Sequence, residues 1–433
     1  MKHLPKLFNR TIRKGTLTLL GPDGERHEAG GTEPGPDVTI RIHDPALDWK
    51  IFSNPELKAA EAFMDGTLTV ESAAQDGTGA WELLELFFLN KRHFDLTPNQ
   101  IFWRGLARGV RRSAQHNPIA RARENVRHHY DLGNTLYQRF LCDDLQYSCA
   151  YYESINETLD EAQTAKKRHI AAKLCLKPGQ RILDIGCGWG GMALYLAHAA
   201  DVHVTGVTLS EEQLVVARAR AEALGVADRV EFRLQDYRDV PETYDRIVSV
   251  GMLEHVGITQ LTAYYLKVRD LLGPGGVALI HSISSKAPPG VTSPFLRKYI
   301  FPGGYAPSLS EAAASLEKSG LWLTDCEIWR MHYAETLREW RRRFQADRAA
   351  IEAMYDEKFG RMWEFYLAAC EGAFRYGASN VFQMQLARER DDAPLTRDYI
   401  EAAKADLRTR EADFMPAILA STATALDPPA PPR

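Results

Sequence analysis

The sequence predicts an α/β protein: a Rossmann-like sheet with helices on both faces, preceded by a smaller α+β unit. Strand-like and helix-like segments alternate between residues 155 and 285, which is the pattern of a mostly parallel sheet. A glycine-rich loop follows the first of these strands. Residues 1 to about 115 instead show short β-like runs, divided by Gly/Pro turns, and then two helical stretches.

The N-terminal unit is expected to hold two strands and two helices. The strands are "GTLTLL" (15–20) and "DVTIRIH" (37–43), divided by turns such as "GPDG" and "EPGPD". The helices cover "PELKAAEAFMDG" (55–66) and "AWELLELFFLNKRHF" (80–94). The second helix carries an apolar stripe made of Trp81, Leu84, Phe88 and Leu89. We expect this stripe to pack in a core, and contact with a lipid chain is the alternative.

The alternating region supplies the predicted main sheet. Strands are expected at 181–187, 201–210, 230–236, 244–253 and 275–284, and helices at 190–200, 211–224 and 259–272. Ligands of such sheets bind at the carboxyl ends of the strands.

The remainder of the chain completes the catalytic region. Residues 286–320 form a long aromatic-containing insertion, typical of a lid over an α/β site. A strand at 321–329, helices at 334–350 and 358–376, and a last strand at 380–388 follow. We therefore expect an N-terminal domain at 1–115, a catalytic domain at 116–390 and a helical tail at 391–433.

Composition excludes several classes of protein. The chain is 45% apolar, 25% charged and has a net charge of −4, which is unlike a disordered or fibrous protein. No apolar run reaches the roughly 18 residues of a membrane span, and "MKHLPKLFNR" lacks a secretory h-region. The six cysteines contain no CxxC pair, so we expect reduced thiols, no metal site and a cytoplasmic protein.

A basic run lies between Ile101 and Tyr130, where seven arginines are opposed only by Glu124. It is either a solvated helix face or a patch for an anionic surface. Nucleic acid is disfavoured because no motif of a known nucleic-acid module accompanies the run, which leaves anionic phospholipid as the functional alternative.

The glycine loop reads "LDIGCGWGG", with Gly186, Gly188 and Gly191 in a GxGxxG pattern. That pattern is weak evidence by itself. Asp184 discriminates between ligands, because a carboxylate there would repel a pyrophosphate and suits the ammonium of a methionine moiety. The sequence thus favours an S-adenosylmethionine-dependent class I methyltransferase sheet over a dehydrogenase.

Two later strand ends offer further cofactor contacts. "GVTLSEEQ" provides Thr208, Glu211, Glu212 and Gln213 as candidates for the ribose hydroxyls. "LQDYRDV" provides Asp236 for the adenine amino group.

Several segments together resemble the cyclopropane fatty acid synthase family. They are "HHYDLGNTLYQRFL", "QYSCAYYE", "LDIGCGWGG", "GVTLSEEQ", "VSVGMLEHVG", "LIHSIS", "KYIFPGG", "HYAETLREW" and "ACEGAFR". They run in order from about 126 to 388, and "EAFMDGTLTVE" extends the resemblance into the N-terminal part.

The resemblance implies transfer of a methylene unit from S-adenosylmethionine to the double bond of an unsaturated phospholipid acyl chain. It places these residues at the cofactor: Tyr147, Ser148, Gly186, Gly188, Gly190, Gln213, Asp236 and Tyr237. It places a bicarbonate ion among Cys149, Glu254, His281, Ile283 and Tyr333, and matches Cys370 to the position usually given as the active-site cysteine. It also implies a homodimer.

The chemistry agrees with these residue types. An alkene attacks the sulfonium methyl directly and leaves a carbocation, so ring closure needs a base rather than an enzyme nucleophile. Cys149 is therefore interpreted as a small residue at a close approach, and we favour pocket lining over covalent chemistry for Cys370. Each of these residues also has a purely structural alternative. Glu254 could be a solvent-exposed carboxylate, His281 a core histidine whose hydrogen bonds are satisfied, and Tyr333 a side chain that only packs.

The substrate double bond lies within a bilayer, so the enzyme is expected to adhere to the inner face of the membrane. The arginine run would hold anionic headgroups, and Phe295, Tyr299, Ile300 and Phe301 would enter the interface. Three alternative functions stay open: a fatty-acid methyltransferase that makes a methyl- or methylene-branched chain, a small-molecule N-methyltransferase, and a lipid-binding protein without catalytic activity.

Overall fold

The computed structural model describes residues 1–71, 78–94 and 133–426. These residues divide into two compact units. The first unit contains the chain up to residue 94 together with Gly290–Pro302 and Tyr333–Ser379. The second unit contains the other described residues. Within the described residues, no helix combines the length and the apolar character needed to cross a bilayer.

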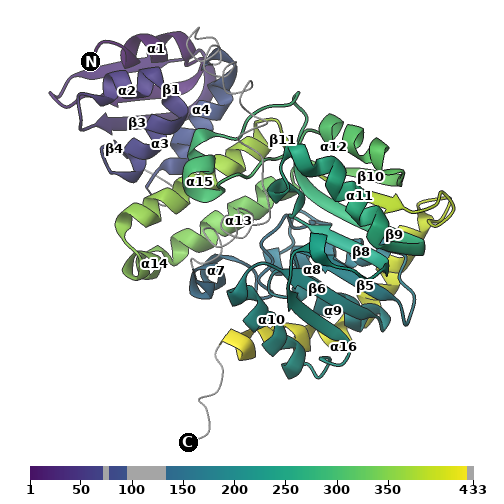
Figure 1. Cartoon of the computed structure of the whole chain (residues 1–433). Coiled ribbons are helices and arrows are strands. Elements are labelled where there is room, and N and C mark those ends of the chain that lie inside the picture. The colour runs from purple at the N-terminus through teal and green to yellow at the C-terminus, as the bar shows by residue number, and fades with distance from the viewer. Residues whose placement is uncertain (72–77, 95–132, 427–433) are drawn as a thin grey trace, which may run out of the picture. The chain divides into compact units, whose positions relative to one another are not determined.

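A four-stranded sheet forms the base of the first unit, in the order β2-β1-β3-β4 (Figure 1). Its strands are β1 (Lys14–Leu20), β2 (Arg26–Gly30), β3 (Glu33–Ile42) and β4 (Leu68–Val70). β1 pairs antiparallel with β2 and parallel with β3. The two predicted strands are confirmed as β1 and β3, whereas β2 and β4 were missed because "RHEAG" and "LTV" are too polar or too short to show a strand pattern.

Three of the described helices contact this sheet: α1 (Leu4–Thr11), α3 (Pro55–Met64) and α4 (Ala80–Phe94). α2 (Leu47–Ser53) packs on α1 and α3. Later in the chain come α13 (His332–Ala346), α14 (Arg348–Met354) and α15 (Glu357–Arg375). α15 packs against α3 and α4. The apolar stripe of α4 lies in this packing: Leu84 is buried, and a β-carbon on Gly372 of α15 would overlap the ring of Phe88. The predicted core role of the stripe is confirmed at these positions.

The predicted lid contributes a π-helical turn, Leu296–Ile300, to the first unit. Phe295 and Ile300 are 2% and 1% exposed, and the Phe295 ring lies edge-on to Phe365 of α15 at 5.1 Å. The expectation that these two side chains enter a membrane interface is therefore wrong for this conformation, because both are used in packing the unit.

The second unit contains a seven-stranded sheet in the order β10-β11-β9-β8-β5-β6-β7 (Figure 1). Its strands are β5 (Arg181–Ile185), β6 (His203–Thr208), β7 (Val230–Leu234), β8 (Tyr244–Val250), β9 (Leu272–Ser285), β10 (Trp322–Trp329) and β11 (Ser379–Ala387). Parallel pairing joins β5 to β6 and β8, β6 to β7, and β8 to β9. β10 and β11 pair antiparallel. The predicted strand and helix alternation is confirmed.

Helices cover both faces of this sheet. They are α7 (Asn134–Phe140), α8 (Leu159–Lys173), α9 (Gly191–Ala200), α10 (Glu211–Ala223), α11 (Leu261–Leu271), α12 (Leu309–Leu316) and α16 (Asp398–Leu426). One buried cluster joins the sheet to α8, α9, α10 and α16, and a second joins the sheet to α11 and α12. Two apolar layers thus enclose the sheet, as a parallel arrangement requires.

Several helices differ from the sequence prediction. α1, α2, α7 and α12 were not predicted. α8 was not predicted either, although a reciprocal capping box between Thr158 and Glu161 begins it. The sequence of α8 shows no clear apolar stripe, because this helix buries charged side chains, among them Lys166 and Lys167, as well as apolar ones. The helix expected at 334–350 is divided into α13 and α14 at Asp347.

Candidate functional site

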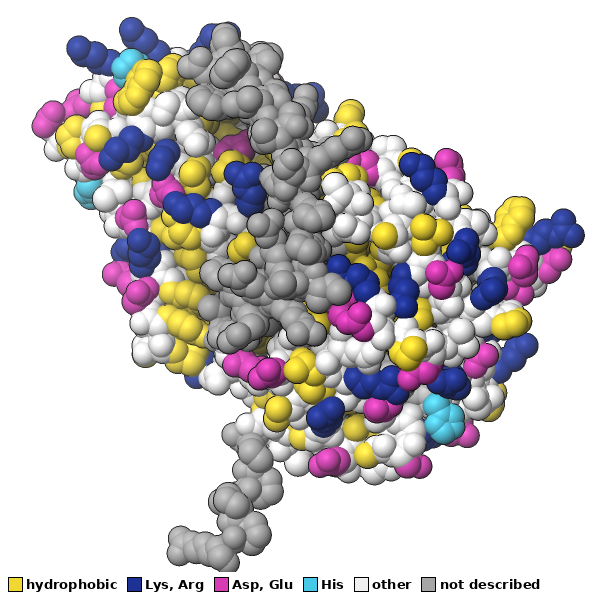
Figure 2. Space-filling model, in the orientation of Figure 1, with side chains coloured by type: hydrophobic (Ala, Val, Ile, Leu, Met, Phe, Trp, Pro, Cys, Tyr) yellow, Lys and Arg dark blue, Asp and Glu magenta, His cyan; other side chains and the backbone are white. Residues whose placement is uncertain are grey.

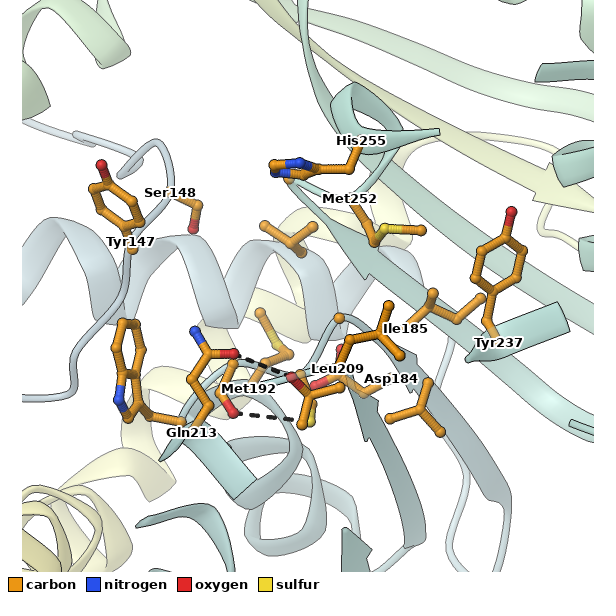
Figure 3. Close-up of a pocket in the computed structure, with 18 of the residues that line it drawn as sticks. Tyr147, Ser148, Asp184, Ile185, Met192, Leu209, Gln213, Tyr237, Met252 and His255 are labelled. Atoms are coloured by element: carbon orange, nitrogen blue, oxygen red, sulfur yellow. Dashed lines mark hydrogen bonds between the residues drawn. The ribbon is translucent and has the colours of Figure 1, made fainter. Parts of the chain in front are cut away.

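A pocket opens at the carboxyl ends of β5, β6 and β8 in the second unit (Figure 3). Nine of the ten residues predicted to hold the cofactor line this pocket: Tyr147, Ser148, Asp184, Gly186, Gly188, Thr208, Gln213, Asp236 and Tyr237. This is the position at which parallel α/β sheets bind ligands. Sequence motifs from four separate segments therefore meet at one cavity.

Gly190 is the predicted cofactor residue that does not line the pocket. It precedes α9 with φ +84°, and a β-carbon there would approach Phe232 of β7 to 2.7 Å. Gly190 is thus needed for the left-handed turn and for close packing of the loop on the sheet. Gly188, in contrast, has φ +54° and lines the pocket, so it leaves the backbone open to a ligand.

Asp184 lies at the pocket with one carboxylate oxygen unsatisfied. The residue is 2% exposed, and its buried Oδ2 has no hydrogen-bond partner in the described part of the chain. Burial raises the pKa of Asp184 to about 7. A buried carboxylate in this state calls for a cationic partner, so the site fits the ammonium of an amino-acid ligand.

Two of the four candidate residues that follow β6 lie at the pocket. Thr208 and Gln213 line the pocket, whereas Glu211 and Glu212 do not. Thr208 Oγ1 donates to Gln213 Oε1 at 3.1 Å, which turns the amide nitrogen of Gln213 away from Thr208 (Figure 3). The Gln213 nitrogen is thereby oriented as a donor for a ligand oxygen.

Asp236 lies at the end of β7 and already has a strong partner. Arg238 Nε donates to Asp236 Oδ1 at 2.8 Å, and Arg238 Nη2 donates to Oδ2 at 2.7 Å. This fork holds the carboxylate in one orientation at the pocket wall. Arg238, which lines the same pocket, was missed by the sequence analysis.

Glu254 follows β8 and is oriented by a backbone contact. The Ile283 N–H on β9 donates to Glu254 Oε1 at 2.6 Å, while Oε2 is buried without a hydrogen-bond partner among the described residues. Burial raises the pKa of Glu254 to about 7. The predicted pair Glu254 and Ile283 therefore is in direct contact, and one carboxylate oxygen stays available as an acceptor.

His281 on β9 contacts the amide of Gln383. It is 2% exposed, and Gln383 Nε2 lies 3.1 Å from His281 Nδ1. With the amide in this orientation, Nδ1 accepts and the neutral ring carries its proton on Nε2. Burial holds the pKa of His281 well below its usual range. Trp329 packs edge-on to the ring at 5.0 Å.

The cysteines show no sign of activation. Cys149 is fully buried, and its thiol lies 3.3 Å from the carbonyl oxygen of Ala150. Cys370 lies on α15 of the first unit, where burial raises the pKa of its thiol to about 12. Nucleophilic cysteines have a lowered pKa, so the thiol of Cys370 is unsuited to covalent chemistry.

Tyr333 also belongs to the first unit, on α13. Its ring contacts Phe374 at 4.7 Å and Trp340 at 5.8 Å. The six predicted catalytic residues are thus divided: Cys149, Glu254, His281 and Ile283 in the second unit, and Tyr333 and Cys370 in the first. None of the six lines this pocket.

Two pocket residues extend the sequence interpretation. His255 was not among the predicted site residues, but it lines the pocket and burial lowers its pKa to about 4. Trp189 was not singled out, although it lines the pocket and donates from Nε1 to Asn134 at 2.8 Å. The position of Trp189 inside the glycine motif was an available signal.

Comparison with known proteins agrees with this geometry. Residues 118–384 match the family described as mycolic acid cyclopropane synthetase. The chain is 39% identical over 354 residues to the cyclopropane-fatty-acyl-phospholipid synthase of Escherichia coli, covering 81% of this chain and 87% of the relative. It is 36% identical over 388 residues to a probable fatty acid methyltransferase of Pseudomonas putida, covering 87% and 94%.

A solved structure shows the same fold. The mycolic acid cyclopropane synthase CmaA1, complexed with SAH and CTAB, superposes with a TM-score of 0.58 at 31% identity, over 63% of this chain and 99% of that one. The strand-end pocket and the matched segments thus point to one conclusion. The chain belongs to the cyclopropane synthetase family and is an S-adenosylmethionine-dependent methyltransferase.

Proposed function

We propose that the protein transfers a methylene unit from S-adenosylmethionine to the cis double bond of an unsaturated acyl chain in a phospholipid, with bicarbonate as the base. The name and coverage of the Escherichia coli relative support the substrate class. The observation that carries the base is the buried Oε2 of Glu254, which has no hydrogen-bond partner among the described residues. That oxygen is suited to accept from an ion that carries a hydroxyl group.

Bound S-adenosylmethionine supplies the methyl group, and bicarbonate supplies the base that removes a proton from it. Glu254 Oε2 accepts a hydrogen bond from the ion, and Ile283 keeps the other carboxylate oxygen in place. His281 donates from Nε2, because Gln383 occupies Nδ1. We assign Cys149 as the small residue that allows close approach.

No thiol is required in this mechanism. The alkene is the nucleophile, so the enzyme needs to hold the reactants, exclude water and accept one proton. The raised pKa of the Cys370 thiol agrees with a lining role. We accordingly assign Cys370 to packing beside the acyl chain.

Analysis of the lipid product in a suitable host tests this function. The protein is expressed in a host whose phospholipids carry defined monounsaturated chains, and extracted lipids are examined by mass spectrometry and proton NMR. We expect one added CH2 group, cyclopropane protons and loss of the olefinic protons. An unchanged lipid profile, with soluble protein that binds S-adenosylhomocysteine, would contradict the proposed substrate.

A second candidate is favoured by the Pseudomonas putida relative, whose name is probable fatty acid methyltransferase. Such an enzyme would share the methyl transfer and differ in the fate of the cation, giving a methyl- or methylene-branched chain. The same lipid extract separates these products. A methyl branch adds two further hydrogens, and a methylene branch shows exocyclic vinyl protons.

We also propose that a cytoplasmic homodimer works at the inner face of the membrane and prefers anionic lipid. The arginine run that motivates this lies outside the described residues. On the face shown in Figure 2, the described basic side chains are interspersed with acidic ones. Sedimentation with anionic and zwitterionic vesicles tests the proposal. Binding that ignores lipid charge and salt would contradict it.

A further inference from the structure

A buried lysine lies behind the cofactor pocket. Lys166 of α8 has no exposed surface, yet its Nζ donates to Ser148 Oγ and to Gln146 Oε1, each at 2.8 Å. Ser148 and Gln146 line the pocket, and Lys166 does not. The ammonium thus acts on the pocket through two side chains that a ligand can reach.

The surroundings of Lys166 carry excess positive charge. Asp144, itself 2% exposed, accepts from Lys167 Nζ and from Arg220 Nη2, each at 2.5 Å. Gln146 Nε2 also donates to Asp144 at 3.0 Å, so Gln146 bridges this carboxylate and Lys166. The hydrogen-bonded cluster holds three cations and one carboxylate, and the carboxylate of Asp184 also interacts electrostatically with Lys166. Buried charge is costly without a counter-charge, so an anionic group nearby would be stabilised.

The Ser148 hydroxyl can transmit this charge. A hydroxyl has one hydrogen and two lone pairs, and Lys166 uses one of the lone pairs. The hydrogen is therefore left for another acceptor, and the hydroxyl lies at the pocket (Figure 3). Asp184 presents an unsatisfied carboxylate oxygen to the same pocket. The Ser148 hydroxyl, backed by the Lys166 ammonium, and the Asp184 carboxylate thus face one cavity. This pair of groups is complementary to the carboxylate and the ammonium of an amino acid.

We propose that Lys166 is a positioning residue that directs the Ser148 hydroxyl, backed by its own buried charge, to the carboxylate of the cofactor's methionine part. This rests on the proposed occupancy of the pocket by the cofactor. Asp184 would take the ammonium of the same amino-acid group. Burial lowers the pKa of Lys166 to about 8, so an anionic ligand would also help to keep this lysine charged.

The test compares two ligands by calorimetry on the full chain. One is S-adenosylhomocysteine, and the other is its decarboxylated analogue, which keeps the adenosine and the amine. Lys166→Met removes the charge and keeps a long apolar stem. We expect it to weaken S-adenosylhomocysteine binding about tenfold or more, as for loss of a charge-assisted hydrogen bond. Binding of the decarboxylated analogue should change by less than about twofold.

Two further variants keep the test decisive. Ser148→Ala retains the lysine and removes only the hydroxyl, and it should show the same selectivity, even where Lys166→Met fails to fold. Lys177→Met is the control: it removes a lysine that is exposed and does not line the pocket, so the affinity ratio of the two ligands should stay unchanged.

Three outcomes would overturn the proposal: equal weakening of both ligands by Lys166→Met or Ser148→Ala, no weakening of either, or the same selectivity in Lys177→Met. Wild-type protein that binds neither ligand would instead contradict the assignment of the pocket to the cofactor. The two failures are therefore distinguishable.

Discussion

Replacement of Glu254 by glutamine should lower turnover by about two orders of magnitude while leaving the fold intact. The amide oxygen can still accept from the Ile283 N–H, which holds Oε1 at 2.6 Å. The other atom changes from an unsatisfied acceptor into a donor, so the hydrogen bond to the base is lost. A hydrogen bond to a charged group contributes about 1.5–3 kcal/mol, which corresponds to roughly a 10- to 150-fold loss of rate.

The same substitution should raise stability at neutral pH. Burial raises the pKa of Glu254 from 4.5 to about 7, so the folded protein binds this proton more tightly than the unfolded chain does. Stability therefore falls as pH rises from about 4.5 to about 7, and the full cost, at most about 3 kcal/mol, is present above that range. Glutamine has no charge to bury, so Glu254→Gln gains stability above pH 7, and the gain disappears below about pH 4.5.

The assay measures product formation on vesicles of unsaturated phospholipid, with S-adenosylhomocysteine affinity and urea unfolding followed in parallel. Exposed Glu222→Gln on α10 is the control and should change none of the three. Turnover above half the wild-type value, at unchanged cofactor affinity, would refute the role of Glu254. A fall in stability above pH 7 would refute the account of its burial.

Three other substitutions test separate parts of the structure. Asp184→Asn should weaken S-adenosylhomocysteine binding about tenfold, and wild-type affinity should rise between about pH 6 and about pH 8 as Asp184, with a pKa of about 7, loses its proton; calorimetry that finds no pH dependence would contradict this. Cys149→Ser should retain more turnover than Glu254→Gln, because serine keeps the small size; the reverse order in the vesicle assay would restore a chemical role for the thiol. Phe295→Ala should lower the free energy of unfolding by about 3–5 kcal/mol, because the side chain is buried; an unchanged urea midpoint with weaker vesicle binding would return Phe295 to the membrane interface.

Much of the cofactor pocket was predictable because its signals are local. Asp184 and the glycines lie within a few residues of one strand, and the strand–turn–helix pattern places them at a carboxyl end. Thr208 and Gln213 follow the next strand in the same way. Glu211 and Glu212 could not be separated from them by sequence, since the side of the helix that faces the pocket depends on how α10 packs.

Other features depend on contacts between distant segments. Phe295 has the composition of a lipid-facing residue, but it packs on Phe365, seventy positions along the chain. Lys166 has the appearance of a surface lysine on a charged helix, and α8 was missed for the same reason. The residues that flank Phe295 and Lys166 in the sequence therefore do not predict that these side chains are buried, or which partners they contact.

Strand periodicity, turn residues and strand-end acids act over a few positions, so the sequence by itself predicted the strands of the main sheet, its ligand-binding edge and the role of Asp184. The residues of the chemistry, such as Glu254 and His281, were expected only from the family resemblance. Tertiary structure decided which of those residues are buried and which partner each one has. It gave Glu254 its contact with Ile283, His281 its tautomer through Gln383, and Lys166 its place behind Ser148. The physical reason is that desolvation and hydrogen bonding depend on every segment that closes around a group, and these segments come from the whole length of the chain.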